Sequence, residues 1–263
     1  MTVVDVHAHT FNGDDLPLKG FVQRVLMHNV GALNLVSWVL EQVGQDGTPG
    51  YESERAQLDR LLGVSDSNLP AMAFVTGPAL EDQVQELYDK AGREDPRLLI
   101  DAERDMASLQ LGRPPEPEAL SVTGDLDAAK RAIAWALLFR RPRLDITRLL
   151  VSTYTKVDLF VPMTVDMAVG LHEAPKVTLL QQADLHEKIS RLSMLGRLQE
   201  GSSAQIHPFM GFDPRSELRS LQAGDPISAF MSLQVAITDY GFIGVKLYPP
   251  MGFARSRTWP AQR

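Results

Sequence analysis

The first nine residues constrain the fold of this chain more than any other stretch. Along residues 3–9 apolar and polar side chains alternate, which is the period of a β-strand. The alternation puts Asp5, His7 and His9 on one face of that strand. Histidines at positions i and i+2 have Cα atoms roughly 6–7 Å apart, so both imidazoles can reach one divalent cation. We therefore predict that His7 and His9 are metal ligands.

The competing interpretation is an ordinary first strand with two incidental histidines. Placing an acid and two histidines on an inward face costs free energy unless these groups are used, which favours the metal interpretation. Turn-forming and polar residues follow at 10–17, so the histidine pair is expected at the carboxyl end of the strand. In a (β/α)8 barrel this end of the strands forms the active site.

Composition limits which ligands and partners are expected. The 263 residues carry a formal net charge of -7, which argues against nucleic acid or an anionic membrane as a partner. The chain has no cysteine, so a metal has to be held by histidine, carboxylate or a modified lysine. No signal-peptide pattern is visible, and the longest apolar run, residues 25–40, is too short and too polar to span a bilayer. We therefore expect a cytoplasmic protein.

The first half of the chain is predicted to be mostly helical. Its apolar spacing indicates helices at residues 20–45, 52–62, 81–91 and 128–140. The last of these helices carries an apolar stripe that we expect in the core, namely Ala132, Ile133, Ala136 and Leu137. The basic residues 140, 141 and 143 are expected on a solvated face.

The second half alternates between strands and helices. Strands are indicated at residues 157–163, 204–210 and 241–250, and helices at 178–198 and 227–240. Strand, helix, strand, helix and strand in this order build a parallel sheet with crossover helices. The strands end in polar or proline-rich loops, where the sites of α/β proteins are assembled.

Three stretches resemble the amidohydrolase superfamily, in particular its amidohydrolase-related (family 2) branch. The sequence His7-Ala8-His9 is similar to the His-x-His that ends the first barrel strand and binds the catalytic metal in that family. Residues 207–214 resemble a third-strand segment. Residues 241–249 resemble the fourth-strand pattern, a glycine-flanked Val-Lys-Leu followed by an aromatic residue or histidine and by proline.

The resemblance covers only part of such a barrel. The family's further ligands are a histidine after each of strands five and six and an aspartate after strand eight, and no stretch here matches them. We therefore expect an α/β fold in one truncated domain, residues 1–263: a partial (β/α)8 barrel of about four parallel strands. Residues 52–148 would be a helical insertion between strands one and two. The basic tail, residues 254–263, suggests an interrupted reading frame, the alternative being an ordinary disordered C-terminus.

Lys246 and Asp166 are the candidate catalytic residues. Alternation along the last strand puts Lys246 on the inward face, where a lysine needs a partner or a changed charge state. In binuclear members of the resembling family the lysine of strand four is carbamylated and bridges two metals, whereas in other members it serves structure or substrate. Asp166 and Asp213 follow strands two and three, where they would position substrate or metal ligands, or cap a loop.

The remaining histidines are expected to have other roles. His28 and His186 fall on predicted helices, where we expect partly exposed surface side chains. His172 lies in the loop after strand two, on the side of the site, and is a weaker ligand candidate. His207 is expected to be structural first and a site residue second.

The resemblance implies a metal-dependent hydrolase that cleaves C–N or C–O bonds of a small-molecule substrate with a metal-activated water. The expected cofactor is a divalent metal, Zn2+ in preference to Mn2+ or Fe2+. For this chain alone we expect impaired activity and self-association through an open sheet edge. Two alternatives stay open: a metal-dependent non-oxidative decarboxylase of the same branch, and a catalytically silent remnant or subunit that needs a complementary C-terminal half.

Overall fold

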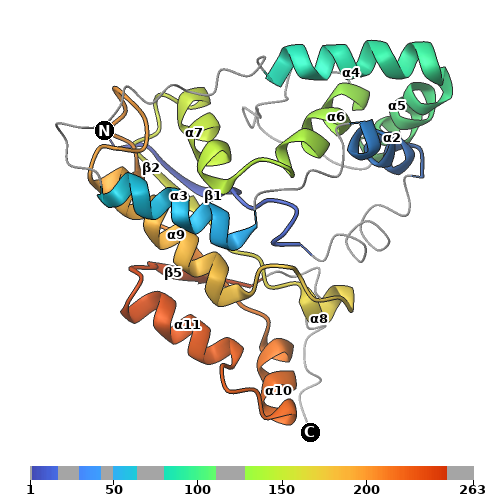
Figure 1. Cartoon of the computed structure of the whole chain (residues 1–263). Coiled ribbons are helices and arrows are strands. Elements are labelled where there is room, and N and C mark those ends of the chain that lie inside the picture. Colours follow the sequence, from blue (N-terminus) through green and yellow to red (C-terminus); the bar gives the residue numbers. More distant parts are fainter. Residues whose placement is uncertain (1, 17–29, 43–49, 64–79, 111–127, 248–263) are drawn as a thin grey trace, which may run out of the picture. The chain divides into compact units, whose positions relative to one another are not determined.

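The computed structural model describes residues 2–16, 30–42, 50–63, 80–110 and 128–247 (Figure 1). The chain divides into two compact units. The first contains Met1–Gly20 and Lys156–Arg263, and the second contains Phe21–Thr155. His28, the start of the helix predicted at residues 20–45 and the basic tail lie outside the described residues.

The first unit contains two small parallel sheets. In the three-stranded sheet, β1 (Val4–Ala8) pairs with β2 (Leu159–Pro162), and β2 pairs with β3 (Gln205–Ile206). In the two-stranded sheet, β4 (Phe209–Gly211) pairs with β5 (Gly244–Lys246). The predicted strands at the N-terminus, near residue 160 and near residue 245 are thus confirmed, and so is their parallel pairing.

A proline divides the strand predicted at residues 204–210 into β3 and β4. Pro208 has no backbone N–H and cannot donate to a neighbouring strand, so the ladder stops there. Just before it, the His207 N–H still donates to the Phe160 carbonyl at 3.1 Å. Just after it, an isolated parallel bridge joins Met163 to Phe209 and links the end of β2 to β4. The carboxyl ends of the strands therefore follow one another along one edge.

Helices connect these strands, as in a parallel α/β fold. α9 (Leu179–Met194) packs against β3 and against α11 (Ala229–Thr238), which in turn contacts α10 (Pro214–Ala223). The start of α9 is set by a capping box. The Thr178 hydroxyl accepts from the Gln181 backbone N–H at 3.3 Å, and the side-chain oxygen Oε1 of Gln181 accepts from the Thr178 backbone N–H at 2.9 Å. The crossover helices predicted here are confirmed. α10 and the short α8 (Ala168–Leu171) are additional.

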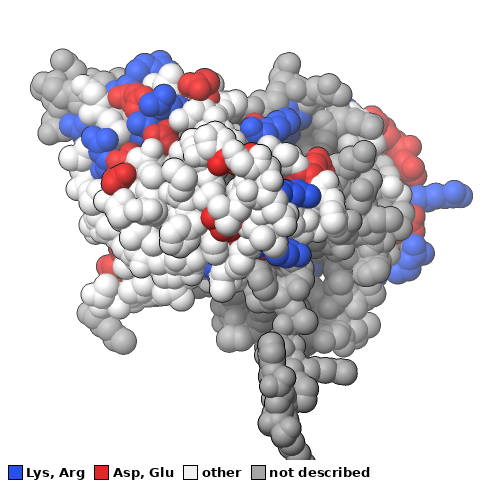
Figure 2. Space-filling view, turned by 90° about the horizontal axis from the view of Figure 1, so that it is seen from below, with Lys and Arg blue, Asp and Glu red and all other residues white. Residues whose placement is uncertain are grey.

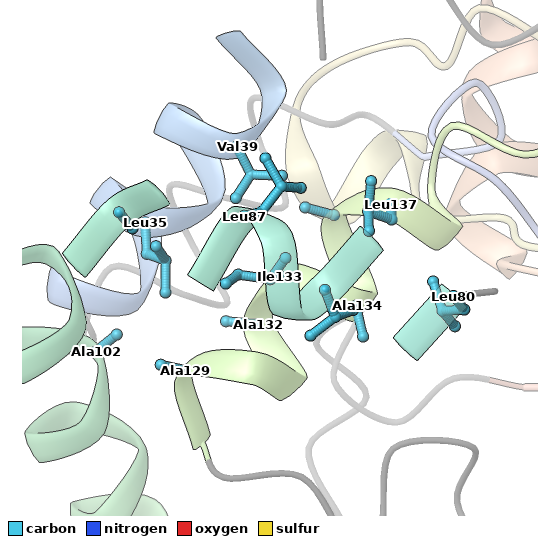
Figure 3. Packing of buried hydrophobic residues seen from close by; sticks show 13 residues of the cluster. Leu35, Val39, Leu80, Leu87, Ala102, Ala129, Ala132, Ile133, Ala134 and Leu137 are labelled. Carbon is cyan, nitrogen blue, oxygen red and sulfur yellow. The ribbon is translucent and has the colours of Figure 1, made fainter. Parts of the chain in front are cut away.

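The described residues of the second unit form helices and short turns, with no strand among them. Its elements are α2 (Val30–Gln42), α3 (Tyr51–Gly63), α4 (Leu80–Glu94), α5 (Pro96–Gln110), α6 (Ala128–Leu138) and α7 (Arg143–Thr153). Leu35 and Val39 from α2, Leu87 from α4 and Ile133 from α6 meet in one buried cluster (Figure 3). The stripe predicted on α6 is buried at all four positions, so that prediction is confirmed.

One expectation for this unit is wrong. Arg143 does not lie on a solvated face but is fully buried, with its guanidinium paired to the carboxylate of Glu54, itself buried. The second carboxylate oxygen of Glu54 accepts from the Arg143 backbone N–H at 2.9 Å. Because Arg143 is the first residue of α7, Glu54 both neutralises the guanidinium and supplies an acceptor at the helix start.

The fold class is therefore mixed α/β with parallel strands, and the described residues form no closed barrel. Both outermost strands expose apolar side chains: Val6 of β1 is 61% exposed and Val245 of β5 is 40% exposed. These two side chains are thus not covered by the parts of the chain that the structure describes. None of the helices in these parts combines the length and apolarity needed to cross a membrane.

Candidate metal centre

The histidine pair lies at the end of β1, as the turn-forming residues 10–17 predict, but the register of β1 shifts between Asp5 and Ala8 and interrupts the predicted alternation. β1 ends at Ala8, so His9 directly follows the strand at its carboxyl end. His7 is exposed and His9 is half-buried. The backbone N–H of His7 donates to the carboxylate of Asp5 at 2.9 Å, which fixes Asp5 beside the pair.

The two imidazoles are close to each other. Their ring centroids are 4.9 Å apart with an interplanar angle of 83°. On its other side the ring of His9 contacts Phe11, with centroids 5.3 Å apart. This separation is compatible with one nitrogen of each ring approaching the same cation.

The surroundings of His9 favour its neutral form. Burial lowers the pKa of His9 to about 4, with further lowering by the positive charges of His7 and Lys246 and an opposing effect of Asp5. The ring is therefore neutral at pH 7 and keeps a lone pair for a cation. Its Nδ1 atom is buried without a hydrogen-bond partner. An orphaned buried nitrogen is costly, and a bound cation would satisfy it.

Lys246 is brought towards this pair. It is the last residue of β5, where it lies opposite Gly211 of β4, and its side chain is partly buried. Its charge acts on the pKa of His9, which shows that the lysine lies within electrostatic reach of the candidate ligands. The structure thus gathers Asp5, His7, His9 and Lys246 around one location.

This donor set fits a divalent cation held by two imidazoles. Neutral histidine is the form that binds a metal, and the unpartnered nitrogen of His9 is a ready donor. Within the described ranges, no group of three or more His, Cys, Asp or Glu side chains is arranged to hold a metal. Further coordination in this part of the chain would come from water, substrate or a modified Lys246.

Asp166 lies elsewhere. Its hydrogen-bond partners, Asp213 and Ser216, belong to the start of α10 and not to the histidine pair. The Asp166 carboxylate accepts hydrogen bonds from the Asp213 N–H and from the Ser216 hydroxyl, both at 2.8 Å. Burial raises the pKa of Asp166 to about 6, against the lowering effect of these hydrogen bonds. Its predicted catalytic role stays a prediction.

Asp213 takes the capping role that the sequence left open. Its carboxylate accepts from the Arg215 N–H at 2.9 Å at the start of α10 and is paired with the Arg215 guanidinium at 2.8 Å. Together, Asp166 and Asp213 connect the loop after β2 to the first turn of α10.

Gly211 makes this connection possible. A Cβ at Gly211 would collide with the backbone carbonyl of Thr164, so only glycine allows the loop after β2 to pack on β4. The Gly211 N–H also donates to the Thr164 hydroxyl at 2.8 Å. The approach brings the loop to the position from which Asp166 reaches α10.

The other described histidines differ from the pair in their surroundings. The prediction that His186 is a partly exposed surface residue is wrong, because it is fully buried in α9. Its Nδ1 lies 2.8 Å from the Gln182 carbonyl and its Nε2 lies 3.1 Å from the Thr10 hydroxyl, so the ring is a satisfied structural group. His172 is exposed at the end of α8 with a positive φ of 56°. The backbone of His207 binds β2, in keeping with the expected structural role.

A pocket of about 370 Å³ lies near Asp166 and was not predicted. It is formed by the loop after β2, α8, the start of α9, α10 and α11. Ser216 and Arg219 of α10 line the pocket, and neither was among the predicted site residues. A signal was present, because an aspartate followed by proline is typical of a helix start, and here Asp213 caps α10 with Pro214 in its first turn.

Comparisons with known proteins add no assignment: no family model, no curated protein and no solved structure matches this chain. The function proposed below therefore rests on the residues and their arrangement.

Proposed function

We propose that this chain is a metal-dependent hydrolase with a divalent cation held by His7 and His9. The observation that carries the proposal is His9: its pKa is lowered to about 4 and its buried Nδ1 has no partner. A neutral imidazole with an unsatisfied nitrogen next to a second imidazole is the arrangement that a cation would complete. Zn2+ is the preferred ion because it suits imidazole ligands, with Mn2+ or Fe2+ as alternatives.

The bound metal would supply an activated water and polarise a carbonyl group of the substrate. The chain's own residues would prepare this chemistry. Asp5 accepts from the His7 backbone N–H at 2.9 Å and holds the backbone beside the two ligands. Lys246, within electrostatic reach of His9, would orient an anionic substrate group or, when carbamylated, add a ligand. Asp166 would act as a positioning residue that holds the loop after β2.

Turnover assays test the proposal. The metal-stripped chain is supplied with Zn2+ or Mn2+ and offered a panel of amides, lactones and carboxylated aromatic compounds. We expect slow hydrolysis that requires the added metal and is lost in His9→Ala. The matched control is His172→Ala, because the His172 side chain is exposed and the residue caps the C-terminal end of α8. Metal-independent hydrolysis, or equal rates in His9→Ala, would contradict the proposal. Release of CO2 from the carboxylated compounds would instead indicate a decarboxylase.

A second candidate function is that of a subunit whose site is completed by another chain. The observation that favours it is the apolar surface of the two outermost strands and of α11, where Val6, Val245 and Phe230 are exposed. Figure 2 views the molecule from below Figure 1, the side on which α10 and α11 lie. It shows a broad area with few charged side chains. Within the described residues β1 pairs only with β2 and β5 only with β4, so each leaves one backbone edge free. A metal-loaded chain that binds Zn2+ at His9 but hydrolyses none of the panel would favour this candidate.

A further inference from the structure

The pocket between the loop after β2 and helices α8 to α11 has a composition typical of a small-molecule site. Its volume of about 370 Å³ falls at the lower end of the range for ligand pockets, about 300–1,000 Å³. Val165, Met167, Leu179 and Ile227 give it an apolar lining. Neither His7, His9 nor Lys246 belongs to the lining, so the pocket is separate from the candidate metal centre.

Several polar side chains of the lining are already occupied. The two oxygens of Asp166 accept from the Asp213 N–H and the Ser216 hydroxyl. The amide of Gln182 accepts from the Val165 N–H at 2.8 Å and donates to the Val165 carbonyl at 3.1 Å. These hydrogen bonds connect the segments that form the pocket. A ligand could bind the same groups only after the bonds are broken.

Arg219 differs from them. It lies on the same face of α10 as Ser216 and Ser220, which also line the pocket. Its side chain is exposed, and no hydrogen bond or ion pair joins it to another described residue. A guanidinium at the edge of an apolar pocket, without a carboxylate partner in the described chain, is a ready site for an anionic group.

We propose that this pocket binds a small hydrophobic monocarboxylate, with the carboxylate against Arg219 and the hydrocarbon part inside the apolar lining. One guanidinium matches one carboxylate in charge and in planar geometry. A phosphate dianion fits less well, because a single arginine would have to balance it while the carboxyl group of Asp166 lines the same pocket.

Calorimetric titration with octanoate tests the proposal, using octanol and octylamine as matched probes with the same hydrocarbon chain. The full chain is titrated in the presence of a chelator, so that any cation at the histidine pair does not contribute. We expect saturable binding of octanoate at millimolar concentration or below, and at least tenfold weaker binding of octanol and octylamine. Arg219→Gln is expected to weaken octanoate binding at least tenfold. The matched control Arg191→Gln removes a charge from α9 outside the lining and is expected to change it less than twofold.

A second variant tests the hydrocarbon part. Ala168→Leu adds three carbons to a half-buried residue of the lining and is expected to weaken octanoate and octanol alike. His9→Ala is expected to leave octanoate binding unchanged, which separates this pocket from the proposed metal centre. The proposal is overturned if octylamine or octanol binds as tightly as octanoate, if Arg219→Gln binds octanoate like the unmodified chain, or if no saturable binding occurs at millimolar concentration.

Discussion

Arg143 and Glu54 form an ion pair that is closed to solvent, although 89 residues separate them in the chain. Glu54 also accepts from the Arg143 backbone N–H at the start of α7. The pair therefore joins α3 to α7 within the second unit. A buried charge that loses its partner is strongly destabilising, so this contact can be tested by removing one side.

Arg143→Met is expected to lower the free energy of unfolding by about 3–5 kcal/mol, because it leaves the Glu54 carboxylate buried without its cation. Urea unfolding measures the effect. The matched control is Arg104→Met, which removes the partner of Asp101 in an exposed pair and is expected to cost less than about 1 kcal/mol. Equal effects of the two substitutions would contradict the burial of Arg143.

Ile133→Ala tests the helical core of the second unit. Ile133 of α6 is fully buried in a cluster with residues of α2 and α4 (Figure 3), so its truncation is expected to cost about 2–5 kcal/mol. Ile100 of α5 is 62% exposed and provides the control, since Ile100→Ala removes the same atoms from a solvated site. A loss of stability in Ile100→Ala as large as in Ile133→Ala would contradict the burial of Ile133 in the core.

Asp166 predicts a pH dependence of stability. Its pKa is raised to about 6 in the folded chain, so between about pH 4 and pH 6 the folded state holds a proton that the unfolded state has lost. The contribution of Asp166 to stability therefore increases as the pH falls from 7 to 4.5, by about 2 kcal/mol. Asp166→Asn removes this dependence, because its amide can accept from Asp213 and donate to Ser216 without titrating.

The measurement for Asp166 is the difference in unfolding free energy between the unmodified chain and Asp166→Asn at pH 7 and at pH 4.5. At the lower pH the unmodified chain is expected to be more stable relative to Asp166→Asn than it is at pH 7. Ser216→Ala serves as a second probe: it removes a hydrogen bond that stabilises the carboxylate, so the pKa of Asp166 and the pH dependence shift upwards. A difference that does not change with pH would show that Asp166 titrates normally.

The exposed outer strands predict self-association. Val6→Lys together with Val245→Lys places charges on both outermost strands, and we expect less light scattering and less binding of a hydrophobic dye than for the unmodified chain. Ile100→Lys, a change at an equally exposed isoleucine of the helical unit, is the control and is expected to have little effect. Unchanged scattering in the double variant would show that other surfaces cause the association.

Local patterns in the sequence predict the strands and the starts of some helices, but not α8 or α10. The alternation at residues 3–9 predicts β1, and the Thr178–Gln181 capping box marks the start of α9. These signals act over a few residues, so they can be recognised without knowledge of the tertiary structure.

Burial of polar residues could not be predicted in the same way. His186 is buried because Thr10, 176 residues away, supplies a partner for its ring, and Arg143 is buried because of Glu54. The pocket beside Asp166 likewise forms only when α10 and α11 pack near the start of α9. Such sites depend on contacts between distant segments, which a single sequence does not show.

Measuring metal binding by His7 and His9 is the most direct test of the proposed metal centre. The chelator-treated chain is titrated with Zn2+, and the bound metal is counted after dialysis for the unmodified chain, for His7→Ala with His9→Ala, and for His172→Ala. We expect one weakly held Zn2+ per chain, because two imidazoles leave the rest of the coordination sphere mostly to water. The double variant is expected to lose this metal and His172→Ala to keep it. An unchanged amount of bound Zn2+ in the double variant would contradict the assignment of His7 and His9 as ligands.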